Sequence, residues 1–193
     1  MGGGWWRRWP LWVAAPLFAL GGWQIGAAVA IEAKASLAQY LLQRARDRTL
    51  SGEAEVRPWP WADTWPVARL SVPERGVDLI VLAGGHGEAL AFGPGLLPQS
   101  SPTGGPGLTI ISGHRDTHFR FLAELEPGDG VMLETADGLS QSFTVGGSVV
   151  VDYRDVSLAV PRDGRMLTLV TCYPFDALDP GGPERYLVSA MAN

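Results

Sequence analysis

One uncharged segment, from Pro10 to Ile31, constrains the fold of this chain more than any other feature. At about 1.5 Å per residue, a helix of this length matches a hydrocarbon core roughly 30 Å thick. Arg7 and Arg8 precede the segment, whereas the residues that follow it carry mixed charge. This positive bias predicts a transmembrane anchor with its N-terminus in the cytoplasm and the rest of the chain outside.

A cleaved signal peptide is the alternative, because Ala28, Val29 and Ala30 fit a small-x-small cleavage pattern. However, the apolar segment is longer than a usual signal core, and the helical pattern continues past it. The sequence therefore favours a retained anchor over residues 1–31. Both interpretations put the remaining chain outside the cytoplasm.

The next region, residues 32–64, is expected to connect the anchor to a folded domain. Residues 32–50 place apolar side chains on one side at helical spacing, which predicts an amphipathic helix. Residues 51–64 are rich in Pro, Trp and small polar residues, and they are typical of a linker. We therefore expect the folded domain to span residues 65–193.

The pattern within this domain is mainly β. Short apolar runs alternate with Gly and Pro turns, at 65–73, 77–84, 108–114, 141–153, 166–172 and 185–192. A short helix is expected at 116–125, with Asp116 or Thr117 as its N-cap. This arrangement predicts a β-barrel or a β-sandwich with one helical insert. The net charge of -5 gives little reason to expect a nucleic-acid partner.

Cys172 is the only cysteine, so it cannot form a disulfide within its own chain. Outside the cytoplasm this leaves a buried structural cysteine, an intermolecular bridge or a reactive thiol. Strand alternation places Thr168, Val170 and Cys172 on one face, and Cys172 at the end of its strand, before Tyr173 and Pro174. A rigid, partly exposed strand end suits a nucleophile.

A thiol nucleophile benefits from an imidazole that favours the thiolate and later protonates a leaving amine. His114 also ends a predicted strand, so it is the candidate partner of Cys172. His86, in a glycine loop, and His118, on the short helix, are expected to have solvated or packing roles. The spacing of His114 and His118 is that of zinc ligands, but "HRDTH" lacks the Glu of a zinc-protease helix. We predict no metal and no other cofactor.

Acyl transfer also requires a group that stabilises an oxyanion. Arg185 begins the last predicted strand, which follows the loop after Cys172. If consecutive strands are neighbours, Arg185 lies beside the thiol. A surface salt bridge with Glu184 or Asp179 is the alternative role.

Taken together, these segments resemble sortases, the membrane-anchored cysteine transpeptidases. "TLVTC" at 168–172 matches their Thr-Leu-X-Thr-Cys signature, and "SGHRDTHFRFL" at 112–122 is similar to the segment that bears their histidine. Arg185, in "PERYLVSA", stands where their arginine stands, and the resemblance covers residues 65–192. The amino-acid sequences of these segments look most like those of the single-sortase class of Gram-negative, often marine, proteobacteria.

The resemblance implies an eight-stranded barrel with Cys172 as nucleophile, His114 as general acid/base and Arg185 as the oxyanion or substrate ligand. Thr171 and Thr168 belong to the signature and are supporting residues. It also implies a secreted protein substrate with a C-terminal Leu-Pro-X-Thr-Gly-like sorting signal, which is cut between Thr and Gly. The acyl group passes through a Cys172 thioester to an amine or to water. The domain would lie in the periplasm, anchored in the inner membrane.

Two other functions remain open from the residues. The first is a different periplasmic cysteine transpeptidase or hydrolase that acts on cell-wall peptides with the same thiol chemistry. The second is a membrane-tethered β domain that binds a partner and has a buried, inert Cys172.

Overall fold

The computed structural model describes residues 9–85, 87, 89–101, 103, 105–155, 157, 158, 164–177 and 181–193, and for residues 9–12 the backbone alone. The chain divides into two compact units, Met1–Tyr40 and Leu41–Asn193. His86 and Asp179, for which the sequence suggested roles, lie outside the described residues.

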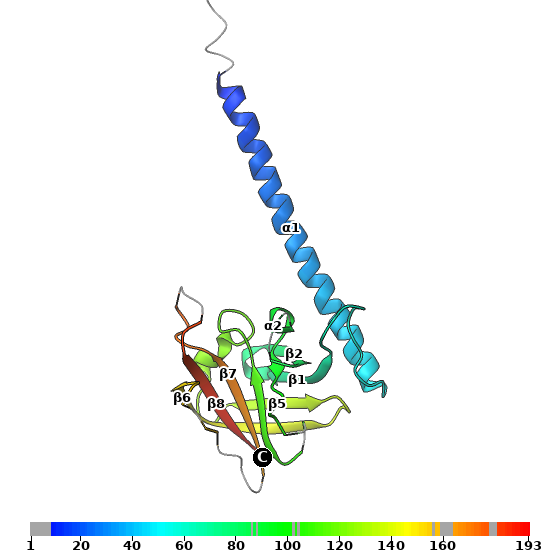
Figure 1. Cartoon of the computed structure of the whole chain (residues 1–193), viewed down its shortest axis with the longest axis vertical. Helices are drawn as coiled ribbons and strands as arrows, with labels where there is room; N and C mark the ends of the chain where they lie inside the picture. The colour runs from blue at the N-terminus through cyan, green and yellow to red at the C-terminus, as the bar shows by residue number, and fades with distance from the viewer. Residues whose placement is uncertain are drawn as a thin grey trace, which may run out of the picture. The chain divides into compact units, whose positions relative to one another are not determined.

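A single helix, α1 (Trp9–Leu50), contains most of the first unit (Figure 1). From Val13 onward it is long and apolar enough to cross a membrane, by length and composition. Phe18 and Trp23 are more than 70% exposed, which suits contact with lipid better than contact with water. The predicted membrane and amphipathic helices are consecutive parts of α1, because residues 31–36 are mostly good helix formers. α1 is therefore a candidate membrane anchor.

The second unit is a closed eight-stranded barrel, which confirms the prediction (Figure 1). Around the barrel the strands follow the order β1-β2-β3-β4-β7-β8-β6-β5. Two neighbouring pairs, β2–β3 and β4–β7, are parallel, and the others are antiparallel. The strands are β1 (Pro66–Val72), β2 (Val77–Ala83), β3 (Gly95–Leu96), β4 (Gly107–Ser112), β5 (Gly130–Thr135), β6 (Ser140–Asp152), β7 (Arg165–Cys172) and β8 (Glu184–Ala192).

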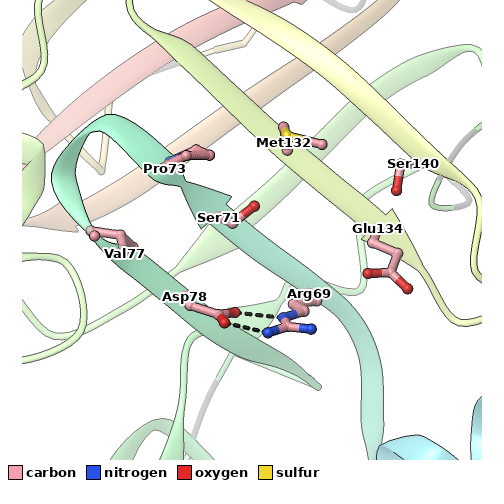
Figure 2. A pocket seen from close by; sticks show the side chains of 9 residues that line it. Arg69, Ser71, Pro73, Val77, Asp78, Met132, Glu134 and Ser140 are labelled. Atoms are coloured by element: carbon pink, nitrogen blue, oxygen red, sulfur yellow. Dashed lines mark hydrogen bonds and ion pairs between the residues drawn. The ribbon is translucent and has the colours of Figure 1, made fainter.

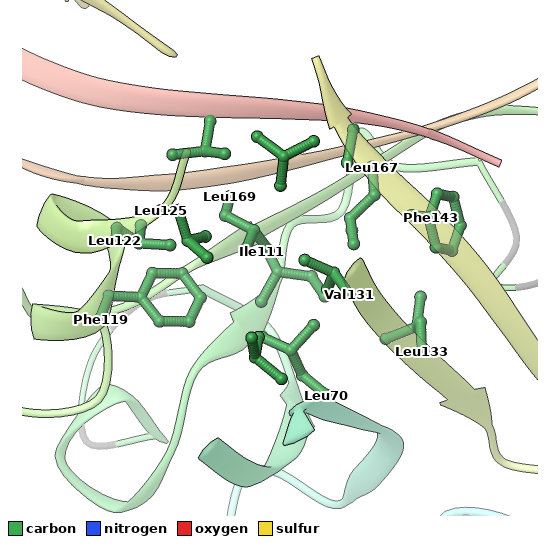
Figure 3. Packing of buried hydrophobic residues seen from close by; sticks show 14 of the residues in the cluster. Leu70, Ile111, Phe119, Leu122, Leu125, Val131, Leu133, Phe143, Leu167 and Leu169 are labelled. Carbon is green, nitrogen blue, oxygen red and sulfur yellow. The ribbon is translucent and has the colours of Figure 1, made fainter. Parts of the chain in front are cut away.

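The barrel interior is filled by alternate residues of these strands. In β1, for example, every second residue is buried, as the period of two requires. Phe119 and Leu122, from the segment between β4 and β5, close the interior against the strand side chains (Figure 3). The packed core fixes the strand ends, where the candidate chemistry lies. Its fully buried large side chains include Leu70, Ile111, Phe119, Leu122, Val131, Leu133, Leu167 and Leu169.

In the described part of the chain, short helices between the strands are α2 (Ala89–Phe92) and the 3₁₀ helices η1 (Pro73–Arg75) and η2 (Arg120–Glu124). η2 is shorter than the helix predicted at 116–125. The predicted cap is wrong, because Phe119 occupies the N-cap position and no side chain bonds to the first turn. The aromatic ring of Phe119 is instead fully buried, so core packing determines where η2 begins.

The end of α1 and the following segment pack within the second unit. Leu42 is fully buried with Leu82 and Ala89, and the Trp59 ring lies edge-on to Phe92 at a centroid distance of 4.9 Å. Val56, Ala62 and Thr64 are also buried. Residues 41–64 therefore contribute to the folded unit that contains the barrel.

Residues after β3 extend the pairing of β4. The Ser100 hydroxyl accepts a hydrogen bond from the Ile110 N–H at 2.9 Å and donates one to the Ile110 carbonyl at 3.1 Å. The Leu97 N–H donates to the same carbonyl at 2.9 Å. This part of the long Gly/Pro loop satisfies backbone groups that β4 would otherwise leave unpaired.

Candidate active site

Strand register brings the three predicted catalytic residues to one edge of the barrel. Cys172, the last residue of β7, is directly opposite Arg185 in the antiparallel partner β8. On the other side of β7, Ser112 of β4 is opposite Val170, and the Gly113 N–H donates to the Val170 carbonyl at 3.1 Å. His114 follows Gly113 directly, so it leaves β4 beside the last residues of β7. β4 ends at Ser112, so His114 lies two residues beyond the strand that the sequence predicted it would end, whereas Cys172 and Arg185 are paired residues of β7 and β8.

Exposure differs among these residues in a way that suits a surface reaction. Cys172 is free and partly exposed, His114 is exposed and Arg185 is partly exposed. Thr168, on the same face of β7 by alternation, is fully buried, and its hydroxyl has no hydrogen-bond partner among the described residues. Of Thr168 and Cys172, only Cys172, at the end of β7, is therefore partly exposed to solvent.

Thr171 connects the two strand ends. Its buried hydroxyl donates a hydrogen bond of 2.7 Å to the Gly113 carbonyl, immediately before His114. Gly113 itself lies against the Phe119 ring, since a Cβ at this position would be 2.8 Å from a ring carbon. The backbone before His114 is consequently fixed by both Thr171 and the core.

Arg115 makes a second connection, just after His114. Its Nη2 donates to the Ala177 carbonyl at 2.7 Å, in the turn that follows Cys172. These two contacts therefore link the two segments on both sides of the candidate residues. The Thr171 contact comes just before His114 and Cys172 in their segments, and the Arg115 contact comes after them. Arg115 was not predicted from the sequence, although it directly follows the candidate histidine His114.

His118 lies half-buried near His114. Burial lowers the pKa of His118, and the charge of His114 lowers it further. The Thr117 hydroxyl is 3.4 Å from His118 Nδ1. This partly buried position is compatible with local packing, one of the two roles that the sequence left open for His118.

The Arg185 guanidinium takes part in local contacts. Its Nη1 donates to the backbone carbonyls of Gly182 and Glu184, at 2.6 Å and 2.8 Å. Its carbon atom lies 4.8 Å from the centroid of the Tyr153 ring. Among the described residues Arg185 forms no ion pair, so the alternative of a salt bridge with the Glu184 carboxylate is not observed. The sequence reasoning missed Tyr153, because only the β6–β8 register brings it here.

A groove of about 500 Å³ adjoins the segments that follow His114 and Cys172. Arg115, Asp116 and Arg120 line it from the segment after β4, and Phe175 and Asp176 line it from the turn after β7. It is a candidate binding groove because Arg115, which follows His114, and Phe175, three residues after Cys172, both line it.

A second concavity, of about 370 Å³, lies over β1, β2 and β5 (Figure 2). Its charged side chains are already paired, Arg69 with Asp78 and Glu134 with Arg46. In the strand order β1 lies diametrically opposite β7. This concavity is therefore remote from Cys172, and we assign no chemistry to it.

Metal ligands are not grouped in the part of the chain that the structure describes. There, no three His, Cys, Asp or Glu side chains are arranged to hold an ion. His114 and His118 have no carboxylate or thiolate completing such a set, and the absence of a metal or another cofactor stays a prediction.

Comparisons with known proteins converge on one family. The family model described as "Sortase domain" matches residues 70–193. Sortase D of Bacillus subtilis (strain 168) is 32% identical over 120 residues, which are 62% of this chain and 60% of that relative's length.

Solved structures show the same fold. Sortase C-1 from Actinomyces oris is 29% identical, with a TM-score of 0.59 over 66% of this chain and 72% of that one. Sortase C from Clostridium perfringens, solved with the C-terminal cell wall sorting motif, is 20% identical, with a TM-score of 0.60 over 83% of this chain and 89% of that one. At 20% identity, the similarity to the Clostridium perfringens structure shows the fold alone.

Proposed function

The chain belongs to the sortase family, and we propose that it is a cysteine transpeptidase in which Cys172, His114 and Arg185 carry the chemistry. The observation that supports this most is the strand register, which puts a partly exposed free thiol between a histidine segment and an arginine. A buried, inert cysteine would not need these neighbours. The catalytic domain proposed is the barrel, residues 65–193.

In the first half-reaction, the Cys172 thiolate attacks the carbonyl carbon of the Thr residue in a Leu-Pro-X-Thr-Gly-like sorting signal. Negative charge develops on the carbonyl oxygen, where Arg185 N–H groups stabilise it. The Thr–Gly bond then breaks, and His114 donates a proton to the departing Gly amine. The products are a Cys172 thioester and the released C-terminal fragment.

In the second half-reaction, an amine or water attacks the thioester carbonyl. His114 accepts the proton of this nucleophile, and the C–S bond breaks to regenerate the thiolate. Thr171 holds the His114 segment against β7 throughout, through its bond to the Gly113 carbonyl. Thr168, buried on the same strand, is assigned a supporting role in shaping β7.

The substrate class follows from the family, and one similar structure, that of Clostridium perfringens sortase C, contains a cell wall sorting motif. We propose that a secreted protein with such a signal is the substrate here. We further propose that α1 is retained as an anchor in the inner membrane, with its N-terminus inside and the barrel in the periplasm of a Gram-negative cell.

The test uses the full-length chain in detergent micelles with a fluorogenic sorting-signal peptide. Cys172→Ala, His114→Ala and Arg185→Ala should each reduce cleavage by at least about 100-fold while circular dichroism stays unchanged. Arg165→Ala, at the opposite end of β7, is the matched control and should retain activity. Intact-mass measurement of wild-type protein should detect the thioester on Cys172.

Full activity of Cys172→Ala would remove the thiol mechanism. Acylation of Cys172 by cell-wall peptides but not by sorting peptides would support the alternative transpeptidase or hydrolase. A thiol that resists alkylation in the native protein would support the non-enzymatic binding domain.

A further inference from the structure

Among the described residues, the contacts of Arg185 come from two directions and use only part of its guanidinium. Its Nη1 bonds to the carbonyls of Gly182 and Glu184, and its carbon atom lies 4.8 Å from the Tyr153 ring centroid. Within the described residues, these hydrogen bonds involve Nη1 alone. The N–H groups on Nε and Nη2 are the remaining donors, and a guanidinium has five donors in all.

Tyr153 is itself fixed by the same turn. Its backbone N–H donates to the Pro183 carbonyl at 3.0 Å, and it directly follows β6, in which Val151 is opposite Arg185. Residues 182–184 thus accept hydrogen bonds from both the Tyr153 backbone and the Arg185 side chain. The ring and the guanidinium meet because one short turn holds both.

One carboxylate that the charge of Arg185 reaches, Asp152, is already paired with another arginine. Asp152 accepts hydrogen bonds from the Arg154 Nε at 2.9 Å and from the Arg154 N–H at 3.0 Å. These bonds lower the pKa of Asp152 to about 2, with a smaller contribution from the charge of Arg185. Asp152 is therefore ionised and forms an ion pair with Arg154. No ion pair between Asp152 and Arg185 is seen among the described residues.

This arrangement has a chemical advantage for an arginine that must bind a developing oxyanion. A carboxylate partner would occupy its N–H donors and offset its charge. An aromatic face attracts the cation through the ring quadrupole and uses none of the donors. The guanidinium can then be oriented and still have free N–H groups and its full charge.

Resting on the proposed role of Arg185, we propose that Tyr153 is a positioning residue whose ring face holds the guanidinium of Arg185. The backbone of Arg185 is opposite Cys172 in the β7–β8 pair. Tyr153 does not touch the reacting atoms. It acts through Arg185, and its ring matters rather than its hydroxyl.

The test compares Tyr153→Leu with the matched control Tyr153→Phe in the full-length chain, with the sorting-signal peptide as substrate. Tyr153→Leu should lower kcat about 3- to 10-fold with little change in KM, as expected when a cation–π contact is lost. Tyr153→Phe should stay within about 2-fold of wild type, because it keeps the ring. In an Arg185→Ala background, measured by single-turnover acylation of Cys172, Tyr153→Leu should cause no further loss.

A second readout does not depend on activity. The Cδ protons of Arg185 should show an upfield ring-current shift in NMR spectra of wild type and Tyr153→Phe, and this shift should disappear in Tyr153→Leu. Wild-type kcat in Tyr153→Leu, equal losses in both variants, or an unchanged NMR shift would overturn the proposal. If the wild type cleaves no sorting peptide, the proposed function fails, whereas the NMR comparison still decides whether Tyr153 holds Arg185.

Discussion

At the scale of single residues, Thr171 joins the strand of Cys172 to the segment of His114. Thr171→Val removes the hydroxyl that donates to the Gly113 carbonyl and leaves this acceptor unsatisfied beside a buried side chain. We expect a loss of about 1–2 kcal/mol in unfolding free energy, measured by urea denaturation, together with lower peptide cleavage. Thr171→Ser keeps the hydroxyl and should recover most of both. A Val variant as stable and active as wild type would contradict this role.

His118 makes stability depend on pH near neutrality. Burial and the charge of His114 lower its pKa in the folded state, so the unfolded chain binds the proton more tightly. Above the unfolded pKa, about 6.5, both states are neutral and the group has no effect. As pH falls below this value, stability is lost until the folded pKa is passed.

Thermal unfolding between pH 7.5 and 5 measures this effect. Wild type should lose more stability over that range than His118→Asn, which has no proton to bind. His114→Ala is the control for the charge contribution, and it should reduce the loss only in part because burial of His118 is the larger cause. Parallel pH profiles for wild type and His118→Asn would show that His118 does not titrate in this way.

At the scale of elements, the sequence predicted those features that depend on local pattern. Alternation placed Cys172 at the end of a strand, and the adjacency of consecutive strands brought Arg185 beside it, as β7 and β8 now show. The cap of η2 was wrong, because burial of Phe119 outweighs the local preference of Asp116 or Thr117. The cation–π contact of Tyr153 depends on the β6–β8 register, which local sequence does not encode.

The last turns of α1 and residues 51–64 are the elements most open to an experimental test. Removing residues 1–40 keeps Leu42 against Leu82 and keeps the ion pair between Arg46 and Glu134. Removing residues 1–64 exposes Leu82 and leaves Glu134 without this partner. We expect the shorter chain to be less stable by about 2–4 kcal/mol, on the basis of the apolar burial that is lost.

Urea denaturation of the two truncated chains measures this difference, and peptide cleavage reports whether the site survives. Leu42→Ala in the longer chain is the matched control, and it should lose part of the same free energy because it removes only the central contact. Equal stability of the two truncated chains would show that the barrel from residue 65 folds without the preceding segment.

At the scale of the whole molecule, the single cysteine can report which side of the membrane the barrel occupies. Cys172 is partly exposed, so a membrane-impermeant maleimide can reach it only from the side on which the barrel lies. Intact spheroplasts of a Gram-negative host that expresses the chain should therefore be labelled without permeabilisation. Cys172→Ala is the control for labelling of other proteins.

The same assay tests why the chain takes this orientation. Arg7 and Arg8 precede the uncharged segment, and positive residues near a membrane helix favour the cytoplasmic side. Changing both to Glu should lower the labelled fraction in intact spheroplasts, with the missing fraction recovered after permeabilisation. Labelling of the wild type only after permeabilisation would place the barrel inside the cell. A secreted sorting signal could not then reach Cys172, so this result would contradict the proposed substrate as well as the orientation.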